Sequence, residues 1–183
     1  MKVKVTPSKV HGNVKIPASK SMAHRALICA SLSDGTSLVS NVTNSKDIEA
    51  TVGCMKALGA IIKQIDETTY EVTGTNLFKQ EGSITCNANE SGSTLRFLIP
   101  LAACTNAKVK FLGQGRLLQR PMDVYANEFK KQNIEFNQSD KEIIVSGNLQ
   151  AKDYVVQGDI SSQFITGFMF VLPLLGQDST LTI

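Results

Sequence analysis

Residues 83–104 read Ser-Ile-Thr-Cys-Asn-Ala-Asn-Glu-Ser-Gly-Ser-Thr-Leu-Arg-Phe-Leu-Ile-Pro-Leu-Ala-Ala-Cys. Polar and apolar residues alternate over 83–87, which predicts a strand. The Ser/Gly-rich segment 89–93 predicts a loop, and the long apolar run that follows it predicts a buried helix. With the residues that follow, the expected elements are strand 83–87, loop 89–93, helix 94–104, strand 108–112, a helix whose first residue is Pro121, and strands 134–136 and 142–145. The order β-α-β-α-β-β therefore defines a unit of about residues 83–147.

The same order is predicted on both sides of this unit. A first unit, about residues 13–75, should contain strand 13–16, helix 22–32, strand 36–42, a helix capped by Asn44 and ended by Gly59, and strands 61–65 and 69–72. A third unit begins at about residue 153, with strand 154–156, loop 157–162, helix 163–175 and strand 180–183. The fold class expected is α/β (α+β), built from a repeated unit. Because the third unit lacks its second helix and last two strands, we expect the 183 residues to be a fragment of a longer protein.

The composition predicts a globular protein. Hydrophobic residues make up 42% and charged residues 19%, which excludes disordered, collagenous and coiled-coil chains. The net charge of +3 is too small for a counterion-release nucleic-acid binder, so we expect no nucleic-acid partner. The longest apolar run, 168–175, is too short to span a membrane, and the N-terminus lacks a signal-peptide core. These features favour a cytoplasmic location without membrane attachment.

The cysteines predict neither a metal site nor a redox dithiol. Cys29, Cys54, Cys86 and Cys104 form no C-x-x-C pair, and only two histidines accompany them. Since Cys29, Cys54 and Cys104 lie among apolar residues, we expect buried free thiols.

Each strand-to-helix loop carries a serine at an equivalent point: Ser21, Ser93 and Ser162 are 72 and 69 residues apart. Such loops precede helix N-termini, where unpaired backbone N–H groups and the helix dipole favour an anion. Three such ends could converge on one ligand. The alternative is that the three serines are ordinary N-caps.

Cations lie near three predicted helix starts: Lys20 and Arg25 at the first loop, Arg96 just inside helix 94–104, and Arg116 and Arg120 around segment 113–121, which precedes the helix expected at Pro121. A cation near a helix N-terminus opposes the dipole, so this placement favours an external anion as partner. The alternative is that each cation forms a salt bridge with an acidic residue of the chain.

Four motifs together resemble the 5-enolpyruvylshikimate-3-phosphate synthase family: Pro17-Ala-Ser-Lys20-Ser21-x-x-x-Arg25, Ser91-Gly92-Ser93-Thr-x-Arg96, Gly113-x-x-Arg116-x-x-x-Arg120-Pro121 and Ser161-Ser162-Gln163-Phe164. The resemblance implies two lobes of three units each, of which this chain lacks the second, and a monomer at full length. It also implies transfer of the enolpyruvyl group of phosphoenolpyruvate to the 5-hydroxyl of shikimate 3-phosphate, in the shikimate pathway of aromatic amino-acid biosynthesis, without metal or organic cofactor.

The resemblance also implies roles for individual residues. Lys20, Ser21 and Arg25 would bind shikimate 3-phosphate, and Lys20 would also reach phosphoenolpyruvate as the catalytic residue of this part of the chain. The phosphate and ring side of shikimate 3-phosphate would be held by Ser161, Ser162 and Gln163. Phosphoenolpyruvate would meet Gly92, whose small size admits backbone N–H contacts, and Arg120. Glu90, Ser93 and Arg96 would support the site.

The resemblance places the proton donor and acceptor in the second lobe, so we expect this fragment to bind anions without turnover. We interpret His24 as a helix-surface or a packed histidine and not as a substitute for them. Three residues depart from the family pattern: Glu90, Ser93 and Phe97. They bear on phosphoenolpyruvate affinity and on sensitivity to the inhibitor glyphosate. Two alternatives remain: a UDP-N-acetylglucosamine enolpyruvyl transferase, and a non-catalytic anion-binding module.

Overall fold

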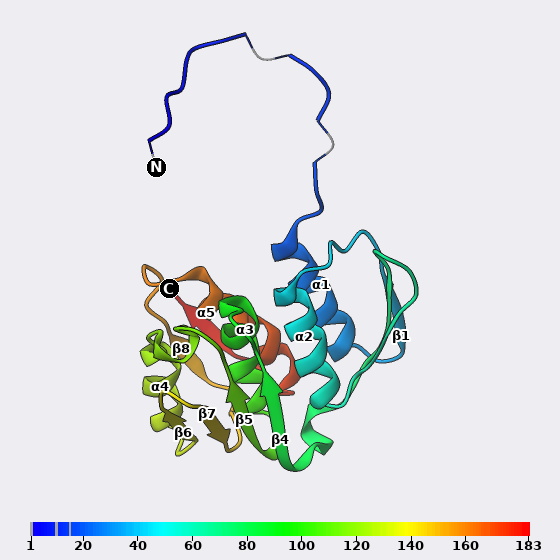
Figure 1. Ribbon diagram of the computed structural model, residues 1–183. Helices are drawn as coiled ribbons and strands as arrows, with labels where there is room; N and C mark the ends of the chain where they lie inside the picture. Colours follow the sequence, from blue (N-terminus) through cyan, green and yellow to red (C-terminus); the bar gives the residue numbers. More distant parts are fainter. Residues whose placement is uncertain (1, 10, 15) are drawn as a thin grey trace.

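The computed structural model describes residues 2–9, 11–14 and 16–183. The described residues before the first helix, 2–9, 11–14 and 16–19, form an extended arm that leaves the globular body (Figure 1). Within the described residues the elements are α1 (Lys20–Leu32), β1 (Thr36–Val39), α2 (Lys46–Ala57), β2 (Ile61–Gln64), β3 (Tyr70–Thr73), β4 (Glu81–Asn87), α3 (Gly92–Ala102), β5 (Asn106–Leu112), α4 (Asp123–Lys130), β6 (Glu135–Gln138), β7 (Ile143–Ser146), β8 (Asp153–Val155), α5 (Ser162–Val171) and β9 (Thr180–Thr182), with 3₁₀ turns at Leu77–Lys79, Leu117–Gln119 and Leu172–Leu174.

The strands form three sheets, and each sheet contains strands of one predicted unit only. The sheet orders are β1-β3-β2, β4-β5-β7-β6 and β8-β9. The antiparallel pairings of β1-β3-β2 repeat those of β5-β7-β6, and the parallel pair β8-β9 repeats β4-β5. The α/β (α+β) class is confirmed, and the second unit shows the full β-α-β-α-β-β order.

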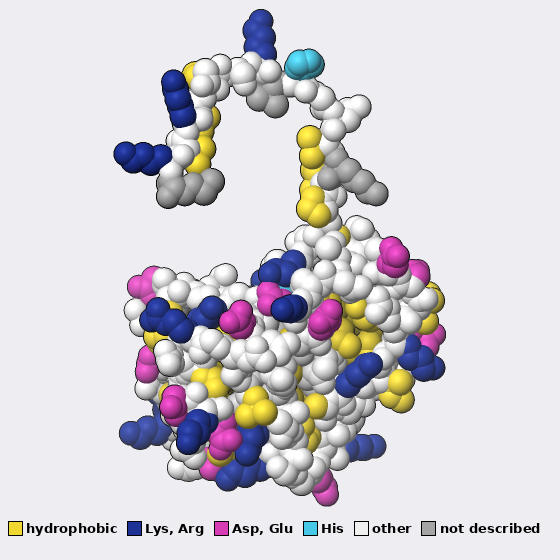
Figure 2. Space-filling view, viewed as in Figure 1, with side chains coloured by type: hydrophobic (Ala, Val, Ile, Leu, Met, Phe, Trp, Pro, Cys, Tyr) yellow, Lys and Arg dark blue, Asp and Glu magenta, His cyan; other side chains and the backbone are white. Residues whose placement is uncertain are grey.

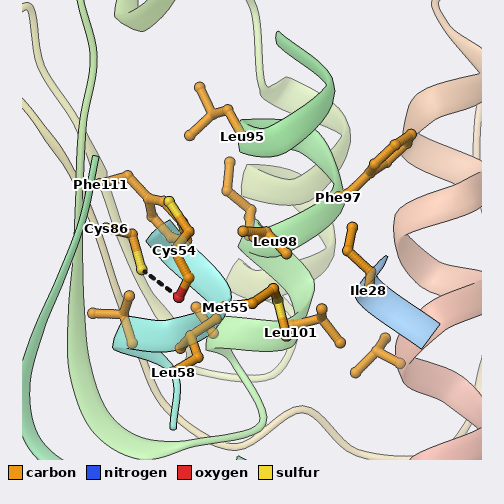
Figure 3. Packing of buried hydrophobic residues seen from close by; sticks show 14 of the residues in the cluster. Ile28, Cys54, Met55, Leu58, Cys86, Leu95, Phe97, Leu98, Leu101 and Phe111 are labelled. Carbon is orange, nitrogen blue, oxygen red and sulfur yellow. Dashed lines mark hydrogen bonds between the residues drawn. The ribbon is translucent and has the colours of Figure 1, made fainter. Parts of the chain in front are cut away.

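Helix α3 occupies the centre of the hydrophobic core (Figure 3). Because it is apolar on nearly every side, it can contact several elements at once. Leu95, Phe97, Leu98 and Leu101 of this helix are at most 1% exposed. They pack in one cluster with Ile28 of α1, Cys54, Met55 and Leu58 of α2, Cys86 of β4 and Phe111 of β5. This packing fixes the N-terminus of α3 relative to α1 and α2.

The strand predicted at 13–16 is wrong for the described residues: Asn13, Val14 and Ile16 form no strand, and residue 15 lies outside them. Their side chains are exposed. Alternation of polar and apolar residues creates a strand only where another strand supplies hydrogen-bond partners. In the described part of the chain, β1 pairs with β3 alone.

Three predicted helix boundaries are corrected. Helix α2 is capped by Ser45, not by Asn44, whose side chain instead donates to the Glu67 carbonyl oxygen at 3.0 Å. Helix α4 begins at Asp123, so Pro121 precedes the N-cap and is not the first helical residue. Helix α5 ends at Val171 because Pro173 has no N–H for the helical ladder and starts a 3₁₀ turn instead.

The prediction for the cysteines is confirmed for Cys54 and Cys104 and wrong for Cys29, which is exposed on α1. The thiols are free. Burial raises the pKa of the Cys104 thiol to about 12, so this sulfur stays protonated and unreactive at neutral pH.

Glu128, 4% exposed on α4, forms ion pairs with Lys131 at 2.5 Å and with Lys152 at 3.1 Å. Burial acts to raise the pKa of this carboxyl, but hydrogen bonds from the two lysines outweigh it and the pKa is lowered. The folded-state pKa is thus below the unfolded one, so the stability from this group is present above about pH 4 to 5 and is lost on acidification.

Glu128→Gln is therefore expected to cost about 1 to 3 kcal/mol of unfolding free energy at pH 7, and less at pH 3. Urea unfolding of both proteins at the two pH values measures this. The prediction is wrong if the difference between the proteins is the same at both pH values.

Candidate anion-binding site

Like α2, the helices α1, α3 and α5 each begin with a serine cap. Ser19 accepts a hydrogen bond from the Met22 N–H, Ser91 from that of Thr94, and Ser161 from that of Gln163. The caps therefore stand one or two residues before the predicted equivalent serines. The alternative that Ser21, Ser93 and Ser162 are N-caps is wrong.

The three equivalent serines lie in the first turns of α1, α3 and α5. Ser21 and Ser162 are exposed, and Ser93 is half-buried. Because their hydroxyls are not used for capping, they remain available for a ligand or for side-chain contacts.

Gly92, the first residue of α3, lies between two guanidinium groups. A Cβ built on Gly92 would overlap Arg120 Nη1 and would lie 3.2 Å from Arg96 Nη1. Burial, and then the adjacent Arg120 charge, lower the pKa of Arg96. Two like charges at a helix N-terminus repel each other and oppose the dipole, so the arrangement favours a bound anion.

The segment that carries Arg120 is fixed by its apolar neighbours. Leu117 and Leu118 of the 3₁₀ turn are buried, and Gln138 Nε2 donates to the carbonyl oxygens of Leu118 at 2.7 Å and Arg120 at 2.9 Å. The side chain of Arg120 is exposed. The predicted convergence of Arg120 with Gly92 is thus observed, although its cause is this turn and not a helix starting at Pro121.

Gln163 connects the N-termini of α5 and α3. Its Nε2 donates to Ser93 Oγ at 2.8 Å, and its Oε1 accepts from Arg96 Nη1 at 2.9 Å. Arg96 Nε is buried and has no hydrogen-bond partner among the described residues. The supporting role predicted for Ser93 and Arg96 is consistent with this link.

Lys20 forms an ion pair with Asp47 of α2 at 2.6 Å. Asp47 was not predicted as a partner, because it lies 27 residues from Lys20 in the chain and no local pattern links the two. Beside this pair, Glu90 and Asn89 border a cavity of about 410 Å³ whose remaining lining is Lys46, Asp47, Glu49 and Gln114. Glu90 Oε1 would lie 2.6 Å from a Cβ on Gly115, so this carboxylate lies against the loop that carries Arg116.

The arginines and lysines differ in their partners. The sequence contains only four arginines, Arg25, Arg96, Arg116 and Arg120. Within the described residues none of the four lies within 4.0 Å of a carboxylate, whereas six lysines do. The salt-bridge alternative is therefore confirmed for Lys20 and wrong for the four arginines. On the face in Figure 2, basic and acidic side chains lie together beneath the arm, where α1 begins.

His24 is 1% exposed and lies in a buried hydrogen-bonded chain that the sequence analysis missed. Its Nδ1 contacts Thr51 Oγ1 at 2.7 Å, Thr51 contacts Thr94 Oγ1 at 2.7 Å, and Thr94 donates to the cap Ser91 Oγ at 2.7 Å. Burial lowers the pKa of His24 to about 4, partly opposed by Asp47. The imidazole is therefore neutral at pH 7, and of the two interpretations left open, a helix-surface or a packed histidine, the burial of His24 selects the second.

The described part of the chain holds no group of three or more His, Cys, Asp or Glu side chains suited to a metal ion. None of its helices is long and apolar enough to cross a membrane.

Residues 4–183 match the family model of EPSP synthase (3-phosphoshikimate 1-carboxyvinyltransferase). Among curated proteins, 3-phosphoshikimate 1-carboxyvinyltransferases of Clostridium perfringens (strain SM101) and Clostridium kluyveri are 47% and 46% identical over 100% and 99% of this chain. The chain spans 43% and 42% of the length of these relatives. An EPSP synthase structure from Acinetobacter baumannii, 20% identical, superposes with a TM-score of 0.76 over 91% of this chain and 38% of its own.

Proposed function

Because the chain belongs to the EPSP synthase (3-phosphoshikimate 1-carboxyvinyltransferase) family, we propose that it supplies one half of a site for enolpyruvyl transfer. In the proposed reaction, the enolpyruvyl group of phosphoenolpyruvate passes to the 5-hydroxyl of shikimate 3-phosphate and phosphate is released. The observation that carries the proposal is the set of four arginines with no carboxylate within 4.0 Å in the described part of the chain, two of which flank Gly92. The family match favours this function over that of a UDP-N-acetylglucosamine enolpyruvyl transferase.

Shikimate 3-phosphate would bind between the first turns of α1 and α5. Arg25 lies on α1 together with Lys20 and Ser21, and Arg25 Nη2 reaches Thr166 of α5 at 3.4 Å. Ser161, Ser162 and Gln163 would contribute from the N-terminus of α5. The helix dipoles and the arginine both favour a phosphate at this point.

Phosphoenolpyruvate would bind at the N-terminus of α3. Arg120 would hold its carboxylate or phosphate in a bidentate pair, while Gly92 allows close approach of the backbone N–H groups. Lys20 would lie between the two anions and offset their repulsion, since each unit-charge pair at ~4 Å contributes about 4 kcal/mol at an effective dielectric of 20. Asp47, which holds Lys20 here, would orient that ammonium group.

The reaction also requires a base for the attacking hydroxyl and an acid for the methylene carbon. We propose that both come from the part of the relatives' length that this chain does not span, which would form a second lobe of three further units. The complete enzyme would be a cytoplasmic monomer that needs no cofactor. By itself, the chain would bind anions without turnover.

Calorimetric titration of the purified chain with shikimate 3-phosphate tests the binding role. Turnover is tested in a fusion that joins the chain to the remaining sequence of the Clostridium perfringens relative, with phosphate release as the readout. We expect binding by the chain alone and turnover only by the fusion. A folded chain that does not bind shikimate 3-phosphate at millimolar concentration would contradict the proposal, and turnover by the chain alone would contradict the need for a second lobe.

The Glu90 carboxylate is expected to weaken the binding of phosphoenolpyruvate more than that of glyphosate. Phosphoenolpyruvate carries only negative groups, whereas glyphosate also carries a cationic amine. In the fusion, Glu90→Asn should lower KM for phosphoenolpyruvate by a larger factor than it lowers the glyphosate inhibition constant. Steady-state kinetics with and without inhibitor measure both. Equal changes in the two constants would show that the Glu90 carboxylate does not face the bound ligand. The matched control is Glu49→Gln, which removes a carboxylate from the wall of the same cavity.

A further inference from the structure

The guanidinium of Arg25 is held in place before any anion arrives. Nη1 donates to the Ser21 carbonyl oxygen at 2.8 Å and to Ser21 Oγ at 2.5 Å, and Nη2 donates to Thr166 Oγ1 at 3.4 Å. The central carbon of the group lies 5.2 Å from the centre of the Phe97 ring. Nε has no hydrogen-bond partner among the described residues, so that edge of the group remains available.

Phe97 itself has little freedom to move. It belongs to α3 and is 1% exposed. Its ring makes edge contacts with Phe170 of α5, at 5.5 Å and 80°, and with His24 of α1, at 6.4 Å and 76°. The aromatic face under Arg25 is therefore a fixed part of the core.

An aromatic face can hold a cation in place without occupying the N–H donors that an anion needs. The negative face of the ring attracts the guanidinium, while the N–H donors point outward in the plane of the group. A carboxylate partner would have to be displaced by an incoming phosphate, as Asp47 would compete for Lys20, but a neutral ring does not compete. Arg25 thus keeps its full charge for the ligand and loses less side-chain entropy on binding.

We propose that Phe97 is a positioning residue that orients the Arg25 guanidinium for a phosphate-bearing ligand. The inference rests on the proposed function only for the identity of that ligand, shikimate 3-phosphate. The orientation of Arg25 in the free protein is independent of it.

The first test uses the free chain. Because the sequence has only four arginines, the ¹⁵Nε–H signal of Arg25 can be assigned by its loss in Arg25→Gln. Replacing Phe97 with 3,4,5-trifluorophenylalanine keeps the shape of the ring and depletes its negative face. We expect the Arg25 Nε–H order parameter to fall in this protein and to stay unchanged in Phe136→Leu, a control that removes an aromatic ring packed on Phe129 of α4.

The second test is calorimetric binding of shikimate 3-phosphate. Fluorination of Phe97 should raise Kd about tenfold, which corresponds to ~1.4 kcal/mol. In the Arg25→Gln background the same replacement should change Kd by less than about twofold, since the ring no longer has a cation to orient.

The two measurements separate the proposals. A lower Arg25 order parameter in the fluorinated protein supports positioning by Phe97. If the unmodified chain nevertheless fails to bind shikimate 3-phosphate, only the proposed function is refuted. An unchanged Arg25 order parameter overturns the inference, as does an equal loss of affinity with and without Arg25, because Phe97 would then act through packing alone.

Discussion

Replacing Arg120 with glutamine should lower kcat/KM for phosphoenolpyruvate about 10²- to 10³-fold in the fusion with the Clostridium perfringens relative. Arg120 Nη1 lies against Gly92 and has no carboxylate within 4.0 Å among the described residues, so its charge is available for the ligand. Removing the charged partner of an anion in a partly desolvated site reduces the binding free energy of the transition state by about 3 to 4 kcal/mol. Steady-state kinetics at saturating shikimate 3-phosphate measure the change.

A matched control removes the same charge elsewhere. Lys110 is a half-buried cation on β5 that pairs with Glu142 at 3.0 Å, outside the N-termini of α1, α3 and α5. Lys110→Gln should change kcat/KM less than twofold. Similar losses in both variants would show that Arg120 acts through the overall field of the protein, and near-unchanged kinetics in Arg120→Gln would refute its assignment to phosphoenolpyruvate.

The largest effect on stability is expected for Gly74→Ala. A Cβ at Gly74 would overlap the Ser33 carbonyl oxygen, which is a backbone atom and cannot rotate away. Adjacent hydrogen bonds hold the two segments together: Gly74 N–H donates to the Gly35 carbonyl oxygen at 3.0 Å, and Thr75 N–H to that of Ser31 at 2.9 Å. We expect a loss of about 3 to 5 kcal/mol, because relief of the overlap must break these contacts.

Gly53→Ala is the control for this stability prediction. Gly53 lies inside α2, is exposed, and a Cβ there would meet nothing within 4 Å. Alanine should stabilise the helix by about 0.5 to 1 kcal/mol. Urea unfolding followed by circular dichroism measures both variants, and an unchanged midpoint for Gly74→Ala would show that the C-terminal end of α1 shifts at little cost.

The repeated order of helices and strands was predictable because its signals are local. The alternating residues of β4, the Ser/Gly loop after it and the apolar run of α3 each determine their own conformation. The pairing of strands within one unit follows because neighbouring elements in sequence pack together. The strand expected at 13–16 failed because a strand also needs a partner edge, which no local pattern reveals.

The observed N-cap residues differ from the predicted ones because several serines and asparagines near each helix start are suitable caps. Ser19 and Ser21 are both suitable capping residues in the sequence, and only the direction of the incoming chain selects Ser19. The same holds for Asn44 and Ser45. Selecting the earlier serines leaves Ser21 and Ser93 for contacts with Arg25 and Gln163, which changes their role from capping to organising the site.

The repeating unit, the family resemblance and the placement of cations near three predicted helix starts follow from the order of residues alone. Which of these cations are neutralised within the chain depends on the packing of distant elements: Lys20 is paired with Asp47, while Arg25 lies over Phe97 and reaches Thr166, 141 residues away. Helical and strand periodicities arise from the backbone within a few residues, so sequence records them directly. Charge pairing instead depends on distances of a few ångströms between side chains of different elements, and these distances are set by how α1, α3 and α5 pack in the core.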